Sequence, residues 1–160
     1  MGALLLDCWR VCGFMSAQHS EVMSLDLPDN AKRFFADVWG IKKLHPPQSE
    51  AMPAVLSGSN TLLAIPTASG KSLVAYIGIL RKLLVDDIGS KAVYIVPLKA
   101  LASEKYEELK QMGDHLGLKI GLGIGDSGRE AVNADSCDIL VCTSEKLDSI
   151  MRSNSDVVAN

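Results

Sequence analysis

The feature that most constrains this chain is a polar turn between a short apolar segment and a long apolar helical pattern. The turn reads Ile65-Pro66-Thr67-Ala68-Ser69-Gly70-Lys71-Ser72. A bound triphosphate needs converging backbone N–H groups, a helix N-terminus directed at the negative charge, a lysine for the outer phosphates and a hydroxyl for Mg²⁺. Gly70, Lys71 and Ser72 can supply the last three. We therefore predict that this turn binds phosphate, with Ser72 as a hydroxyl ligand of Mg²⁺.

The sequence on either side of the turn provides the context that such a phosphate site requires. The segment from Thr61 to Ile65 predicts a strand before the turn, and a helix is predicted from about Lys71 to Asp86. The apolar residues at helical spacing are Leu73, Ile77, Leu80 and Leu84. Glycine is more usual at the positions of Ile65 and Ala68, so the alternative is an ordinary corner with a solvated lysine. The combination of strand, turn and helix favours the phosphate site.

Length, composition and charge limit the classes of protein to which this chain can belong. The chain has 160 residues, of which 48% are hydrophobic and 22% charged, and this is enough to build one domain with a packed core. The net charge of −3 provides no general basic field, so any contact with nucleic acid must be local.

The cysteines and the N-terminal stretch indicate where the protein works. Cys8 and Cys12, like Cys137 and Cys142, lack the Cys-x-x-Cys spacing of a zinc site. Cys137 and Cys142 flank an apolar strand and are expected to be buried free thiols in a reducing compartment. Residues 1–28 lack the pattern of a signal peptide or a membrane span and are treated as an extension without an assigned function. We expect a cytoplasmic protein with no membrane partner.

Strands alternate with helices along the rest of the chain. Asp29 is expected to cap a first helix that ends near Gly40. Further strands are predicted at 91–96, 118–124 and 138–142, and the first of these is expected to be buried on both faces. This alternation predicts an α/β fold with a doubly wound, mainly parallel sheet. Ligands of such sheets bind beyond the carboxyl ends of the strands.

Gln48 follows two prolines at the start of another predicted helix. Its amide can donate one hydrogen bond to the N6/N7 edge of adenine and accept another from it, as Asn or Gln does when it reads adenine in DNA. The alternative interpretation is a helix cap at the surface.

Three groups of residues are candidate contacts to a nucleic-acid strand, and each group follows one of the predicted β-strands. The alternative interpretation of each group is a helix cap or a tight turn. They are Pro97, Leu98, Lys99, Ala100 and Leu101 after the first strand, Gly125 and Asp126 after the second, and Thr143, Ser144 and Lys146 after the third. Backbone N–H groups at turns and helix starts can hold phosphates without reading sequence.

From Leu44 to about Asn154, the sequence resembles the first RecA-like domain of superfamily 2 helicases, and most of all the archaeal HelQ-type DNA repair helicases. The resemblance rests on motifs in the order of the family: Pro46-Pro47-Gln48, Pro66 to Ser72, Pro97 to Tyr106, Gly123 to Asp126 and Thr143 to Lys146. It implies a RecA-like P-loop NTPase that binds ATP, with Gln48 at the adenine, residues 66–72 at the phosphates and Mg²⁺ on Ser72. It also implies single-stranded or forked DNA as a partner, with RNA as an alternative, and a second RecA-like domain.

The family also implies an Asp-Glu box that polarises the attacking water, and no such box occurs before Asn160. We therefore expect residues 29–160 to form a partial first RecA-like domain, truncated before this motif II, with no catalytic residue of its own. The expectation is that this chain binds ATP and single-stranded DNA without hydrolysing ATP or unwinding a duplex. The alternatives are a non-catalytic or vestigial binding module, and a P-loop kinase or other NTPase without nucleic acid.

Overall fold

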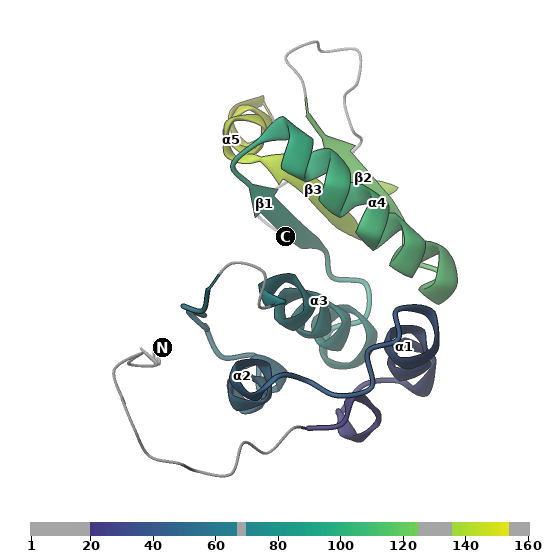
Figure 1. Ribbon diagram of the computed structural model, residues 1–160. Helices are drawn as coiled ribbons and strands as arrows, with labels where there is room; N and C mark the ends of the chain where they lie inside the picture. The colour runs from purple at the N-terminus through teal and green to yellow at the C-terminus, as the bar shows by residue number, and fades with distance from the viewer. Residues whose placement is uncertain (1–19, 67–69, 125–135, 154–160) are drawn as a thin grey trace. The chain divides into compact units, whose positions relative to one another are not determined.

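A computed structural model describes residues 20–66, 70–124 and 136–153. The chain forms two compact units, residues 1–88 and 89–160, which we describe separately. The first unit contains η1 (Val22–Ser24), α1 (Asp29–Arg33), η2 (Phe34–Val38), α2 (Pro46–Leu56), α3 (Lys71–Arg81) and η3 (Lys82–Asp86). The second contains β1 (Ala92–Val96), α4 (Lys99–Leu116), β2 (Ile120–Gly123), β3 (Ile139–Thr143) and α5 (Ser144–Ser153) (Figure 1).

The core of the first unit is built by helices that pack closely on α3. A Cβ added at Gly78 of α3 would lie 2.9 Å from Cγ1 of Val55 on α2, so the glycine permits a close approach of the two helices. At the other side, Trp39 packs against Tyr76 of α3 with ring centroids 5.9 Å apart. Tyr76 is 1% exposed. The helix that carries the predicted phosphate turn is therefore held firmly along its length.

Part of the stretch expected to be an extension packs into this unit. Val22 is fully buried and Leu25 and Leu27 are nearly so. The backbone N–H of Val22 donates to the carbonyl of Lys42 at 3.0 Å, and the N–H of Leu44 donates to the carbonyl of Ser20 at 2.9 Å. Residues 20–27 thus belong to the folded unit, through contacts with a segment some twenty residues away.

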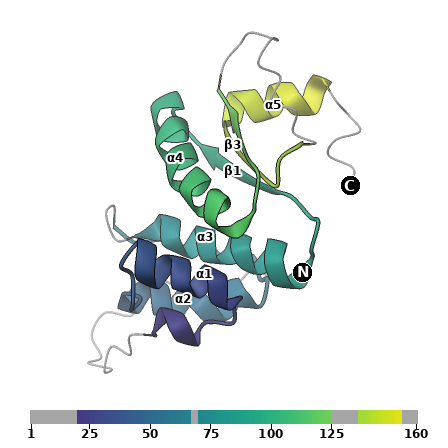
Figure 2. The same ribbon diagram turned by 90° about the vertical axis from the view of Figure 1, so that its right-hand side faces the viewer.

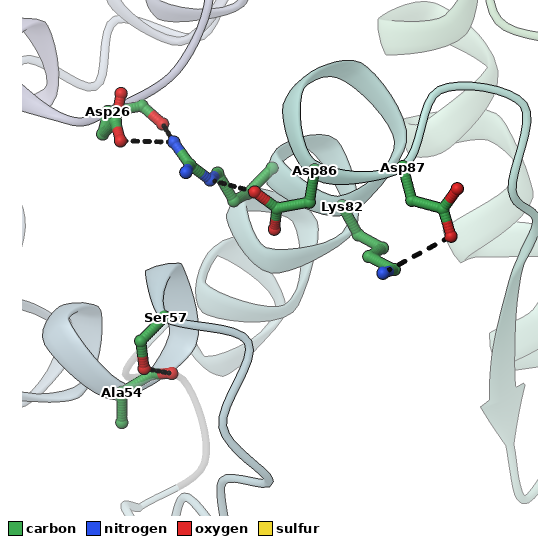
Figure 3. A network of polar contacts seen from close by, with 7 residues as sticks. Asp26, Ala54, Ser57, Lys82, Asp86 and Asp87 are labelled. Atoms are coloured by element: carbon green, nitrogen blue, oxygen red, sulfur yellow. Dashed lines mark hydrogen bonds and ion pairs between the residues drawn. The ribbon is translucent and has the colours of Figure 1, made fainter.

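A network of ion pairs lies at the C-terminal end of α3 (Figure 3). The guanidinium of Arg81 forms an ion pair with Asp26, donates to the backbone carbonyl of Asp26 at 2.9 Å, and donates to Oδ1 of Asp86 at 2.9 Å. The neighbouring pair, Lys82 with Asp87, spans 3.5 Å and is more than half exposed on both sides. Arg81 therefore ties the segment before α1 to the end of α3.

Two local predictions in the first unit are wrong. Pro28, not Asp29, is the N-cap of α1, and Asp29 is instead the first helical residue, with its carboxylate 2.8 Å from the ammonium of Lys32. The structure also assigns no strand to residues 61–65, and the Leu62 side chain is 65% exposed. A strand is defined by hydrogen bonds to a neighbour, and the described strands β1, β3 and β2 pair with one another.

The second unit is a parallel sheet with strand order β1-β3-β2, covered by a helix on each face (Figure 2). Ile120 of β2 contacts Gly113 of α4, while Leu140 and Cys142 of β3 pack against Leu147 and Ile150 of α5. Ile120 pairs with Ile139, so these contacts lie on opposite faces of the sheet. The predicted strands, parallel pairing and doubly wound arrangement are confirmed here.

One face of β1 is more exposed than we predicted. Val93 and Ile95 are 48% and 52% exposed, although they pair with the buried Leu140 and Cys142 on the face that α5 covers. The expectation of a strand buried on both faces is therefore wrong. Cys137 and Cys142 are buried free thiols, as expected. Among the described helices, none has the length and apolar composition needed to cross a membrane.

Candidate nucleotide site and nucleic-acid interface

The predicted phosphate turn ends in a helix start with the required backbone geometry. Gly70 has φ +74° and ψ 33°, a left-handed conformation that favours glycine, and α3 begins at the next residue, Lys71. The first N–H groups of a helix have no partner within it and are directed along the axis toward an approaching anion. Lys71 and Ser72 are the first two residues of α3. Thr67, Ala68 and Ser69 lie outside the described residues.

The Lys71 side chain folds back over the turn. Its Nζ donates to the carbonyl of Ile65 at 2.7 Å and to the carbonyl of Pro66 at 2.9 Å. An ammonium group has three N–H donors, and two of them are used in these contacts. Lys71 therefore has backbone partners, which the alternative of an ordinary corner with a solvated lysine did not include.

Gln48 lies against the same turn. It is 2% exposed, its Nε2 donates to the carbonyl of Gly70 at 3.0 Å, and its Oε1 accepts from the backbone N–H of His45 at 2.8 Å. The second bond makes Gln48 part of the N-terminal cap of α2, although the residue is buried rather than at the surface. The contact with Gly70 was missed. Glutamine at the third position of a helix is a known capping signal, but it does not reveal a partner 22 residues away.

The candidate nucleic-acid residues of the second unit converge at one edge of its sheet. β1 and β3 are parallel, and Val96 at the end of β1 pairs with Thr143 at the end of β3. α4 begins at Lys99 and α5 at Ser144, so both helix N-termini follow neighbouring strand ends. The structure therefore brings together two of the predicted groups, residues 97–101 and 143–146. Gly125 and Asp126, the third group, lie outside the described residues.

Side chains at this edge differ in burial and charge. Pro97, Leu98, Lys99 and Ala100 are exposed, whereas Thr143 is 4% exposed and its Oγ1 lies 3.4 Å from the N–H of Lys146 as a weak cap. The pKa of the Glu145 carboxyl is lowered, first of all by a hydrogen bond from the backbone N–H of Glu145 itself. Hydrogen bonds from the hydroxyl groups of Thr143 and Ser144 and the positive charge of Lys99 lower this pKa further. Glu145 thus places a negative charge beside a helix start, a feature absent from the predicted contacts.

Comparison with known proteins now decides the family. Residues 45–159 match the DEAD/DEAH box helicase family. This chain belongs to that family. The membership confirms the predicted superfamily 2 resemblance and the RecA-like fold class, and it includes both candidate sites described above.

Related proteins agree with this assignment. The ATP-dependent DNA helicase Hel308 of Pyrococcus horikoshii is 48% identical over 122 residues, which are 76% of this chain and 17% of that protein. Hel308 of Thermococcus kodakarensis is 47% identical over 133 residues, 82% of this chain and 12% of that protein. The chain spans less than a fifth of each relative.

A solved structure supports the fold. The crystal structure of the DUF1998 helicase MrfA bound to DNA superposes with a TM-score of 0.69 at 24% identity, over 86% of this chain and 20% of that one. At this level of identity the likeness concerns the fold alone. It agrees with the parallel sheet and flanking helices of the second unit.

Proposed function

We propose that this chain is the ATP-binding and nucleic-acid-binding part of the first motor domain of an ATP-dependent DNA helicase that works in the cytoplasm. Its partners would be single-stranded or forked DNA, with RNA as an alternative strand, and a second RecA-like domain of the same helicase. The observation that carries the proposal is the left-handed Gly70 immediately before α3, with Lys71 directed back over the turn.

The residues around Gly70 suit a magnesium-bound triphosphate. The N–H groups at the start of α3 would donate to phosphate oxygens, and the Lys71 ammonium would leave its two carbonyl partners for the more strongly charged phosphates. Ser72, on the first turn of α3, would offer its hydroxyl to Mg²⁺, which prefers oxygen ligands. Pro66 to Ser69 would complete the cradle. Bound Mg²⁺ would neutralise charge on the phosphates.

The edge formed by residues 97–101 and 143–146 would hold a strand by its phosphates. Two helix N-termini there offer N–H groups, and Lys99 and Lys146 add positive charge. Phosphate contacts of this kind carry no sequence preference, as a translocating motor requires. The net charge of −3 restricts binding to such local groups. Gly125 and Asp126 are proposed to contribute to the same strand contact.

Replacement of Lys71 tests the nucleotide site. Lys71→Ala removes a charged donor, and charged hydrogen bonds contribute about 1.5–3 kcal/mol, or about ten- to a hundredfold in affinity. Titration with a fluorescent ATP analogue in the presence of Mg²⁺ measures the change. Lys82→Ala is the matched control because Lys82 lies just beyond the other end of α3 and is 57% exposed. Unchanged ATP affinity in a folded Lys71→Ala protein would refute the nucleotide site.

A further inference from the structure

β1 is an edge strand, and its outer side carries backbone donors and acceptors (Figure 1). It pairs with β3 on one side, and no described residue pairs with it on the other. The N–H of Ala92 donates to the carbonyl of Asp138 at 2.9 Å, so the polar backbone groups of Ala92 face β3. These groups alternate from side to side along a strand. The N–H and C=O groups of Val93 and Ile95 therefore face outward.

The side chains of the same two residues form an apolar strip beside α5. Val93 pairs with Leu140 of β3, so these two side chains lie on the same face of the sheet. Ile95 pairs with Cys142 in the same way. α5 packs on Leu140 and Cys142. It leaves Val93 and Ile95 48% and 52% exposed, at a position where outward-facing backbone groups and apolar side chains coincide.

The outer edge of β1 has none of the usual protection against pairing with another strand. Folded proteins commonly guard a sheet edge with charged side chains or with proline. β1 reads Ala-Val-Tyr-Ile-Val, so no charge and no proline lies within it. An unguarded edge with exposed apolar side chains is a template for the addition of a strand.

β1 is complementary to a second copy of itself in antiparallel orientation. Tyr94 is the central residue of the strand, and a two-fold axis at Tyr94 places Val93 of each copy opposite Ile95 of the other. Both residues direct their N–H and C=O groups outward, so each such pair exchanges two hydrogen bonds, as alternate pairs of an antiparallel ladder do. The same register sets an apolar side chain opposite an apolar one, a favourable cross-strand pair.

We propose that the outer edge of β1 is a self-association surface, to which a second copy of this chain adds its own β1 in antiparallel orientation. The two three-stranded sheets then become one continuous sheet. Because both copies use the same edge, the contact closes at the dimer. One short strand per copy makes a small interface, so we expect a dissociation constant between about 1 µM and about 1 mM. The proposal is independent of nucleotide and DNA binding.

Sedimentation velocity of the full chain at rising concentration measures this association. We expect the wild type to shift from monomer to dimer, without larger species. Ile95→Lys and Val93→Glu each place a charge opposite an apolar side chain of the second copy, and each should weaken dimerisation about tenfold or more. Met151→Lys is the matched control, because Met151 is 46% exposed but lies on α5 rather than on a strand edge. This variant should dimerise as the wild type does.

An equimolar mixture of the Ile95→Lys and Val93→Glu chains tests the register. In the mixed dimer the two new charges have opposite signs and lie directly opposite each other, while the unchanged Val93 and Ile95 form the second pair. We expect the mixture to dimerise about as strongly as the wild type at concentrations where each variant alone is monomeric. Only folded chains can recover in this way, so recovery separates a lost contact from lost folding.

Four results would overturn the proposal. A wild-type chain that stays monomeric up to about 500 µM would show that the edge is covered within the same chain or does not self-associate. A dimer that Ile95→Lys and Val93→Glu leave intact would use another surface. Open-ended oligomers would exclude the closed two-fold contact, and a mixture that stays monomeric would exclude the antiparallel register centred on Tyr94.

Discussion

Replacing Gly70 by alanine should destabilise the protein by two separate mechanisms, which a matched glycine allows us to measure individually. The first is backbone strain. Gly70 has φ +74°, and an alanine in the left-handed region costs roughly 1–2 kcal/mol. Gly58 has nearly the same φ, +72°, and an added Cβ there would meet no atom within 4 Å. Gly58→Ala therefore reports the strain alone.

The second mechanism is the collision with Gln48. At 2.3 Å from the new Cβ, Nε2 must move, and the side chain loses its bond to the Gly70 carbonyl. A buried polar group without its partner costs about 1–3 kcal/mol. We therefore expect Gly70→Ala to reduce the free energy of unfolding by about 2–5 kcal/mol, against roughly 1–2 kcal/mol for Gly58→Ala.

Urea unfolding followed by circular dichroism provides the free energies, and a double-mutant cycle isolates the collision. In a Gln48→Ala background the side chain that collides is absent, so Gly70→Ala should cost only the strain, roughly 1–2 kcal/mol. The two substitutions should then be non-additive by about 1–3 kcal/mol. Additive effects, or equal costs for Gly70→Ala and Gly58→Ala, would show that Gln48 and Gly70 are not in contact.

Two further predictions concern the second unit. Lys99→Ala should weaken single-stranded DNA binding and lower the magnitude of the slope of log affinity against log salt by roughly 0.7, while Lys110→Ala, further along α4, should leave the slope unchanged. Fluorescence anisotropy at several salt concentrations measures both slopes. Equal slopes for the Lys99 variant and the wild type would argue against a phosphate contact at Lys99. Burial raises the pKa of the Cys142 thiol above its ordinary value of 9.0. The unfolded chain therefore loses this proton at lower pH than the folded chain does, and the free energy of unfolding should fall as pH rises past about 9. Urea unfolding at about pH 8 and about pH 10 should show a smaller fall in the free energy of unfolding for Cys142→Ala than for the wild type. An equal fall in both proteins would show that the Cys142 thiol is not its cause.

Much of the fold could be predicted from the sequence because the signals are local. The apolar runs that predicted strands at 91–96, 118–124 and 138–142 lie within two residues of β1, β2 and β3 at each end. Lys71 begins α3 as expected, because a glycine that tolerates positive φ precedes an apolar pattern of helical period. Backbone conformation and periodicity depend on neighbours in the chain, so they can be read without the tertiary structure.

Apart from the N-cap of α1, the errors concern contacts between distant residues. Residues 61–65 have the composition of a strand, but composition does not supply the hydrogen-bonded neighbour that a strand needs. Val93 and Ile95 are apolar, but their burial depends on which helix covers them, and α5 packs on the neighbouring β3. Residues 20–27 carry no motif, yet Val22 is buried through contacts with residues 42–44. No local pattern specifies these partners.

The sequence by itself determined the family and the composition of the proposed phosphate turn, because Gly70, Lys71 and Ser72 are adjacent and the roles proposed for them follow from residue type and order. Only the tertiary structure decided what surrounds the turn. It placed the Gln48 amide against the Gly70 carbonyl and brought the starts of α4 and α5 to one sheet edge, through the pairing of Val96 with Thr143. The physical reason is that a hydrogen bond or a strand register between residues tens of positions apart depends on the path of the whole chain, and residue type alone cannot specify it.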